Sequence, residues 1–212
     1  MPARGFFVSI EGGEKTGKTT QARLLAGWLL DCGTQVVLTR EPGGTEAGEA
    51  IREILLNSDH DLLSPVTEAL LFAASRGQLV NEVIRPALTA GKTVVADRYA
   101  DSSLAYQSFG LGLPLEEVRR VNELATGGLW PDLTILLDGP DLDGFLRRSR
   151  SGEADRIEKR QGEFHHRVAE GYRQLARSSP GRFTVVDASA GVDQVSKSIR
   201  IELNRRREVP GQ

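Results

Sequence analysis

The sequence predicts an α/β fold in which a five-stranded parallel sheet carries helices on both faces, giving three layers. Short apolar runs with β-branched or aromatic residues show little polar alternation, as expected of parallel strands that are buried on both faces. Amphipathic segments with helical periodicity lie between these runs. The repeated order of strand and helix favours a parallel sheet.

The predicted strands have four or five residues each. They are Phe6–Ile10, Val36–Thr39, Thr93–Ala96, Leu133–Leu137 and Phe183–Val186. In an open parallel sheet, ligands bind beyond the carboxyl ends of the strands. The residues that follow each strand are therefore the first candidates for a functional site.

The first helix follows the first strand. Its apolar residues repeat at i, i+3, i+4 and i+7, at Ala22, Leu25, Ala26 and Leu29. Gly33 can end this helix, because glycine adopts the left-handed conformation that closes many helices.

Ser64 and Pro65 predict the start of another helix, since serine is a good N-cap and proline suits the first helical position. We expect Pro86 to end or kink the helix around Val80–Arg85. Further helices are predicted over Leu115–Ala125, Phe164–Ala176 and Val192–Leu203. His60, His165 and His166 show no metal-ligand spacing, and we expect them on the surface.

Length and composition indicate one domain over residues 1–212. The formal charge of −2 argues against a nucleic-acid partner. Charged residues near the start argue against a signal peptide, and no long apolar run predicts a membrane span. The lone Cys32 fits a reducing compartment, so we expect a cytoplasmic protein.

The strongest chemical signal follows the first strand, where residues 12–19 fit the phosphate-binding pattern G-x-x-x-x-G-K-[ST]. A strand precedes the pattern and an amphipathic helix follows it, as in P-loop NTPase folds. Lys18 is expected to reach the β- and γ-phosphates, and Thr19 to ligate Mg²⁺. The predicted ATP-binding residues are Gly12, Gly13, Glu14, Lys15, Thr16, Gly17, Lys18, Thr19 and Thr20.

Asp97, Arg98 and Tyr99 follow the third predicted strand. Asp97 can join the Mg²⁺ shell or orient groups, and Arg98 can clamp a phosphate with its planar fork. A structural salt bridge is the alternative for this pair. No N-K-x-D segment is present, which argues against a GTP-binding switch protein.

Further segments follow the same strands and helices: Ile10-Glu11-Gly12, Thr39-Arg40-Glu41-Pro42-Gly43-Gly44-Thr45, Leu71-Phe72-Ala73-Ala74-Ser75-Arg76, residues 97–107, Pro131-Asp132-Leu133-Thr134, Leu137-Asp138 and Asp155-Arg156-Ile157-Glu158. Together they resemble the bacterial thymidylate kinase family from about residue 6 to about residue 200. The resemblance implies a homodimeric enzyme that uses ATP and Mg²⁺ to phosphorylate dTMP to dTDP, a step of dTTP biosynthesis.

The resemblance also implies a pocket for thymine. Phe72 and Arg76 lie one helical turn apart and share a face. Phe72 matches the family residue that stacks on the base, and Arg76 matches the donor to its exocyclic oxygen. The alternative is a core phenylalanine beside a solvated arginine.

The sugar and phosphate of dTMP have candidate partners by the same resemblance. Arg98 matches the arginine that grips the acceptor phosphate, and Arg40 is a weaker candidate for that role. Tyr106 matches a residue near the 2′ carbon, where a hydroxyl would clash. Glu14 matches the residue that contacts the 3′-hydroxyl. Ser103 and Gln107 are expected nearby as hydrogen-bonding residues.

Two further substrate-binding candidates adjoin Arg40. Glu41-Pro42 resembles a position where a restrained proline shapes the acceptor pocket, and the sequence leaves its cis or trans state open.

A short lid is predicted over residues 147–160, which are rich in arginine and lysine. Arg150 and Arg148 are the first candidates for an arginine that closes on the transferring phosphate. A solvated helix face is the alternative. Asp155 and Glu158 are expected to orient the lid or approach the nucleotide sugar.

Lys15 departs from the family pattern, which has arginine at this loop position, or glycine there with the arginine in the lid. Lysine lacks the bidentate fork of arginine. We therefore expect a lid arginine to do most of the transition-state work, with Lys15 assisting. The predicted catalytic set is Lys18, Arg98, Asp97, Arg150, Arg148 and Lys15. Another nucleoside monophosphate or deoxynucleoside kinase, or a non-catalytic ATP-binding module, remains an alternative.

Overall fold

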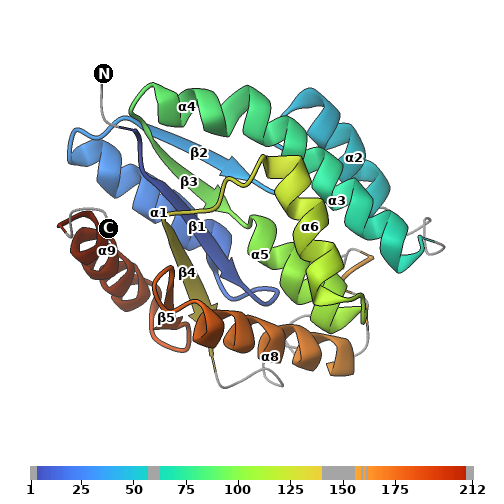
Figure 1. The fold of residues 1–212 in the computed structure, drawn as a ribbon. Helices are drawn as coiled ribbons and strands as arrows, with labels where there is room; N and C mark the ends of the chain where they lie inside the picture. The colour runs from blue at the N-terminus through green and yellow to red at the C-terminus, as the bar shows by residue number, and fades with distance from the viewer. Residues whose placement is uncertain (1–3, 57–62, 140–155, 159, 161, 209–212) are drawn as a thin grey trace.

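The computed structural model describes residues 4–56, 63–139, 156–158, 160 and 162–208 (Figure 1). Its sheet has five strands, all parallel, in the order β2-β3-β1-β4-β5. The strands are β1 (Phe7–Gly12), β2 (Val36–Arg40), β3 (Thr93–Asp97), β4 (Leu133–Asp138) and β5 (Phe183–Asp187). The five predicted strands are confirmed, with small shifts at their ends.

Helices cover both faces of the sheet, which confirms the three-layer prediction (Figure 1). The α-helices of the described residues are α1 (Lys18–Asp31), α2 (Glu46–Leu56), α3 (Pro65–Leu79), α4 (Arg85–Thr89), α5 (Ala100–Ser103), α6 (Leu115–Thr126), α8 (Gly162–Ser178) and α9 (Val192–Glu208). Two π-helical segments, η2 (Val80–Ile84) and η3 (Leu104–Gly110), continue α3 and α5.

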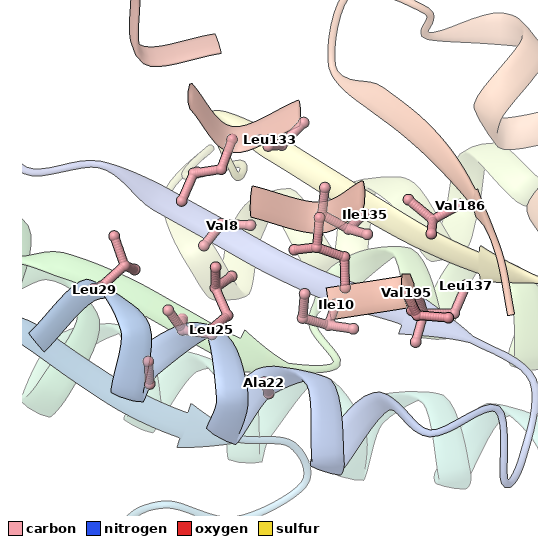
Figure 2. Close-up of a cluster of buried hydrophobic side chains, with 14 residues drawn as sticks. Val8, Ile10, Ala22, Leu25, Leu29, Leu133, Ile135, Leu137, Val186 and Val195 are labelled. Atoms are coloured by element: carbon pink, nitrogen blue, oxygen red, sulfur yellow. The ribbon is translucent and has the colours of Figure 1, made fainter. Parts of the chain in front are cut away.

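Both faces of β1 are buried. Val8 and Ile10 point to the layer formed by α1 and α9, where they meet Leu25 and Val195 (Figure 2). Phe7 points to the opposite layer and packs with residues of η2 and β3. A central parallel strand is thus buried on both sides, and its two polar residues, Ser9 and Glu11, are buried as well.

The strand order places β1 at the centre, with β3 on one side and β4 on the other. The chain runs outward from β1 to β2, returns to β3, and then crosses to β4. Ligands of open parallel sheets bind beyond the carboxyl ends of the strands where the order changes direction. In this protein the segment that follows β1, residues 13–17, lies at that point.

Two predicted helix ends have the expected chemistry. Gly33 has a left-handed φ of 77° after α1, and its N–H donates to Leu30. Ser64 caps α3 by accepting a hydrogen bond from the N–H of Thr67 at 3.1 Å, and Pro65 occupies the first turn.

The structure also departs from the sequence predictions. Pro86 was expected to end or kink the helix, and it does not end it: the chain forms the wider turns of η2 just before Pro86 and continues into α4, where a missing N–H in the first turn is tolerated. Helix α2 and the helical segment over 100–110 were not predicted. His165 is buried against Phe164, so its predicted surface position is wrong.

Candidate active site

The loop after β1 depends on two glycines. Gly12 has a φ of 142°, and a Cβ atom there would lie 2.5 Å from the carbonyl oxygen of Leu137. Gly17 has a φ of 89° and directly precedes the first turn of α1. These conformations favour glycine and let the chain turn sharply from β1 into the N-terminus of α1.

Two non-glycine residues of the described chain also have positive φ: Lys15 at 53° and Arg98 at 71°. Side chains seldom adopt this region, and strained backbone of this kind gathers at functional sites. Lys15 belongs to the loop after β1, and Arg98 follows β3. The strain therefore marks the two segments that the sequence predicts for ATP and for the acceptor phosphate.

Lys18 begins α1 and is 6% exposed. Its Nζ donates a hydrogen bond to the carbonyl of Gly13. Burial lowers the pKa of Lys18 to about 8, helped by Arg98, while Glu14, Asp97 and Glu11 oppose the shift. A buried ammonium at the N-terminus of α1 is well suited to receive a polyphosphate.

Thr19 and Asp97 are brought together from α1 and the end of β3. The Thr19 hydroxyl donates to Asp97 Oδ2 across 2.5 Å. Hydroxyl and carboxylate oxygens are the ligands that Mg²⁺ prefers, and Mg²⁺ is commonly held by one or two protein oxygens together with substrate phosphates. This pair fits the predicted metal position.

Arg98 forms a hub between β3 and the phosphate loop. Its guanidinium donates to Glu14 Oε1 at 2.6 Å, to the Tyr106 hydroxyl at 3.1 Å and to the Gly12 carbonyl at 3.2 Å. It also lies 5.0 Å from the centre of the Tyr106 ring, a cation–π contact. The Tyr106 hydroxyl in turn donates to Glu14 at 2.5 Å.

Glu14 stays ionised in this cluster. Burial alone would raise the pKa of its carboxyl, but the positive charges of Arg98 and Lys18 outweigh burial and lower it to about 2. The ion pair is thus a fixed part of the site near neutral pH, in which a carboxylate from the loop after β1 orients the arginine that follows β3.

These residues line one continuous cavity of about 700 Å³. The lining includes side chains of the phosphate loop and α1, namely Glu14, Lys15, Lys18, Thr19 and Thr20. Asp97 and Arg98 lie on its wall as well. Aromatic and polar residues of α3, α5 and η3 line it too, and these are Phe72, Ser103, Tyr106 and Gln107. Most of the predicted ATP and acceptor residues therefore share one cavity.

Arg76 is an exception, since it does not line the cavity. The side chain is 1% exposed and pairs with Glu41 at 2.6 Å. Its other N–H groups donate to Ser103, Asn122 and the carbonyl of Tyr99. An arginine has five N–H donors, and four of those of Arg76 donate hydrogen bonds within the protein. Arg76 thus holds Glu41 and Ser103 in this structure, and its role as donor to the exocyclic oxygen of thymine stays a prediction.

The segment after β2 forms another part of the wall. The Glu41-Pro42 peptide bond is cis. Arg40 lines the cavity, and its guanidinium pairs with Glu49 at 3.1 Å. Arg52 of α2 also lines the cavity and donates to the carbonyl of Pro42 at 2.9 Å.

Only part of the predicted lid lies in the described chain. Arg147, Arg148, Arg150 and Asp155 lie outside the described residues. Glu158 lines the cavity, and its carboxylate lies 3.9 Å from Lys15 Nζ. Arg156 and Arg160 instead form ion pairs with the buried Glu68 of α3, each at 2.5 Å. These two basic residues therefore anchor their segment to α3.

Arg52 and Glu68 were not among the predicted site residues. Arg52 lies on α2, and the apolar spacing of Ile51 and Leu55 on either side of it was the available signal for that helix. Glu68 occupies the first turn of α3, where an acidic residue is expected for helix stability alone. Its burial could not have been read from the local pattern.

Comparisons with known proteins agree with one another. The thymidylate kinase family model matches residues 10–199. A thymidylate kinase of Symbiobacterium thermophilum is 50% identical over 195 residues, covering 92% of this chain and 90% of that protein. One from Syntrophotalea carbinolica is 47% identical over 212 residues, covering 97% and 98%.

A crystal structure of thymidylate kinase from Ehrlichia chaffeensis has a TM-score of 0.79 and 30% sequence identity to this chain. The match covers 95% of this chain and all of that one. Among the helices of the described residues, none combines the length and apolar character needed to cross a bilayer.

Proposed function

The chain belongs to the thymidylate kinase family, and on that premise we propose that the cavity at the carboxyl edge of its sheet binds both substrates. The enzyme is a phosphotransferase that acts on dTMP with ATP, forming dTDP and ADP. One observation carries the proposal. The phosphate loop and the aromatic wall of Phe72 and Tyr106 line the same cavity, with Arg98 between them in the hydrogen-bond network.

The donor end is the loop over residues 12–20. Its backbone turns into the N-terminus of α1, where N–H groups and the helix dipole favour negative charge. Lys18 adds a buried positive charge beside Gly13. This end of the cavity would hold the terminal phosphates of ATP and stabilise charge on the group that is transferred.

The acceptor end would hold dTMP. Phe72 offers an aromatic face for the base, and Tyr106 packs where a 2′-hydroxyl would clash. Arg98 would grip the acceptor phosphate, which is already largely ionised near neutral pH and needs no strong base. Catalysis then rests on holding two phosphates in line and neutralising their charge.

A magnesium ion would be held by Thr19 and Asp97 together with phosphate oxygens of ATP. When bound, it neutralises charge that develops on the phosphates. Asp97 is assigned to this metal-shell or orienting role. Within the described residues, no cluster of three or more histidine, cysteine or carboxylate side chains could form a metal site by itself.

A lid arginine is proposed to provide most of the transition-state stabilisation, with Lys15 assisting. Lys15 lines the cavity beside Glu158, which ties it to the segment over 156–160. Arg148 and Arg150 keep the role predicted from the sequence. If Lys15→Gly lowers kcat more than Arg148→Ala and Arg150→Ala each do, then Lys15 is the dominant group.

We also propose a homodimer that forms through α3 and α6. Val66 and Leu70 share one face of α3, and their side chains are 55% and 52% exposed. Leu124 of α6 is 87% exposed, and α6 packs on α3 where Gly77 meets Ala125. Exposed apolar side chains on adjoining helices are typical of subunit interfaces. A cytoplasmic location is part of the same proposal.

The oligomeric state can be measured by sedimentation equilibrium. Leu70→Glu should convert the dimer to a monomer. Ile201→Glu is the matched control, because Ile201 is an exposed apolar residue of α9 on the opposite layer. A wild-type protein that sediments as a monomer, or a Leu70→Glu protein that stays dimeric, would contradict this interface.

The substrate assignment is tested by ADP release with dTMP, dUMP, UMP, CMP, AMP and GMP as acceptors. dTMP should give the highest kcat/KM. Another kinase of the same fold would prefer a different acceptor, and a non-catalytic ATP-binding module would show no acceptor-stimulated turnover. Either result would overturn the assignment.

A further inference from the structure

Glu68 is a buried carboxylate on which three elements converge. Its side chain is fully buried in the first turn of α3. It accepts hydrogen bonds from Gln107 Nε2 of η3 at 3.0 Å and from the guanidinium groups of Arg156 and Arg160, each at 2.5 Å. Burial alone would raise the pKa of Glu68, but Arg160, Arg156 and Gln107 outweigh it, and the pKa lies below its usual value.

An ionised carboxylate can only accept hydrogen bonds. The group of Gln107 that faces Glu68 must therefore be the NH₂ and not the carbonyl oxygen. A flip of the amide would place two acceptors against each other inside the protein, where an unpaired polar group is costly. Glu68 thus decides which way the Gln107 amide is turned, and Gln107 lines the cavity.

We propose that Glu68 is a positioning residue that fixes the Gln107 amide in one orientation and thereby helps select the base of the acceptor. The inference rests on the proposed function, in which a pyrimidine nucleotide occupies this end of the cavity. With its nitrogen held by Glu68, Gln107 has its amide oxygen left to accept a hydrogen bond from a base in the cavity. That oxygen accepts the imide N–H of thymine or uracil, whereas cytosine has an acceptor at the same ring position.

The Glu68 carboxylate also has a structural role, because it holds Arg156 and Arg160. An experiment must separate this role from an effect on the choice of acceptor base. Arg156 also donates to the carbonyl of Leu55 at 2.9 Å, and Arg160 stacks over the ring of Phe164 at 4.7 Å. Loss of the carboxylate would loosen residues 156–160 as well as Gln107. Loosening of residues 156–160 should lower kcat/KM for every acceptor by a similar factor. A Gln107 amide that can turn should instead change the ratio of kcat/KM between acceptors.

The decisive variant is Glu68→Gln, which preserves size and removes the charge. An amide at position 68 can face Gln107 with either its oxygen or its nitrogen, so both orientations of Gln107 become available. The ratio of kcat/KM for dTMP to that for dCMP should fall about tenfold, the equivalent of one hydrogen bond. The dTMP-to-dUMP ratio should stay unchanged, because both bases carry the imide N–H.

Arg160→Gln is the matched control. It removes one ion pair of Glu68 and leaves the carboxylate facing Gln107. It should lower kcat/KM for dTMP and dCMP by the same factor and leave their ratio as in the wild type. The proposal is overturned if Glu68→Gln also lowers both values equally, or if Arg160→Gln shifts the ratio as much as Glu68→Gln does.

Should Glu68→Gln fail to fold by circular dichroism, a crystal structure of the wild-type enzyme with dTMP decides the matter. Gln107 Nε2 should remain at Glu68, and Gln107 Oε1 should lie about 3 Å from the imide nitrogen. A base that makes no contact with Gln107 would sink the proposal. A wild-type enzyme without dTMP turnover would instead contradict the proposed function, so the two failures are distinct.

Discussion

Arg98 and Glu14 form an ion pair of 2.6 Å that joins the end of β3 to the loop after β1. The residues are 84 positions apart in the chain, and both line the cavity. The pair sets the arginine that is proposed to hold the acceptor phosphate against the loop that is proposed to hold ATP. Several measurable consequences depend on it and on its neighbours.

Replacing Arg98 with lysine keeps the positive charge and removes the planar guanidinium that can bind a phosphate through two N–H groups. We expect kcat/KM for dTMP to fall about 100-fold, because a misplaced acceptor phosphate loses its in-line position. The Kd of ATP without acceptor should change much less. Arg119→Lys is the control, since Arg119 pairs with Glu116 on the surface of α6. An ATP affinity that falls as far as kcat/KM would place Arg98 at the donor end instead.

Replacing Glu14 with glutamine should destabilise the protein in a pH-dependent way. Its pKa is lowered from 4.5 to about 2, so the ionised group stabilises the fold fully above pH 4.5 and progressively less as the pH falls toward 2. The unfolding free energy of Glu14→Gln should lie roughly 3 kcal/mol below the wild type at pH 7, and roughly 1 kcal/mol below it at pH 3.

Urea unfolding at both pH values measures this gap. Glu117→Gln, an exposed change in the first turn of α6, serves as the control and should show no pH-dependent gap. A Glu14→Gln deficit that is equal at pH 3 and pH 7 would mean that the carboxylate charge contributes nothing.

ATP binding should weaken as the pH rises through the pKa of Lys18, which is about 8 in the nucleotide-free protein. Below that pH the ammonium is charged and attracts the phosphates. At pH 9 only about a tenth of the molecules keep the charge, so the Kd of ATP should rise up to about tenfold between pH 7 and pH 9. Isothermal titration at several pH values tests this, and Lys18→Met should bind more weakly with no such dependence.

Two variants of Tyr106 distinguish the role of its ring from the role of its hydroxyl in the preference for dTMP. The ring is held by edge contacts with Phe164 and Tyr172, at centroid distances of 6.0 and 6.2 Å. Tyr106→Phe should therefore keep the preference for dTMP over its ribonucleotide analogue within about threefold, and lower kcat because Arg98 and Glu14 lose a partner. Tyr106→Leu opens space and should lower the preference about tenfold. Equal preferences in the two variants would exclude a steric role for the ring.

Gly12 and Gly13 offer a matched pair in one loop. A methyl group at Gly12 would lie 2.5 Å from the Leu137 carbonyl at a φ of 142°, whereas at Gly13 the nearest atom would lie 3.9 Å away. Gly12→Ala should cost about 2 kcal/mol or more in unfolding free energy, and Gly13→Ala less than about 1 kcal/mol. Urea unfolding measures both free energies. Similar losses for the two variants would show that the backbone can move to relieve the contact between a methyl group at position 12 and the Leu137 carbonyl.

Much of the fold could be predicted because its signals are local. Apolar runs without alternation indicated all five strands, and the glycine spacing after β1 indicated the phosphate loop. Helix α2 was not predicted, although Ile51 and Leu55 have helical spacing. The helical segment over 100–110 was not predicted either, and its π-helical turns have no simple sequence signal.

The sequence by itself determined the order of strands and helices and the chemistry of the loop after β1, because both depend on neighbouring residues. Only the tertiary structure decided two sets of contacts. Arg76 donates its hydrogen bonds to groups within the protein, and Glu68 binds Gln107, Arg156 and Arg160. Those contacts join residues far apart in the chain. They form only when the strand order has brought α3, η3 and the segment over 156–160 together, and that order is set by packing of the whole sheet.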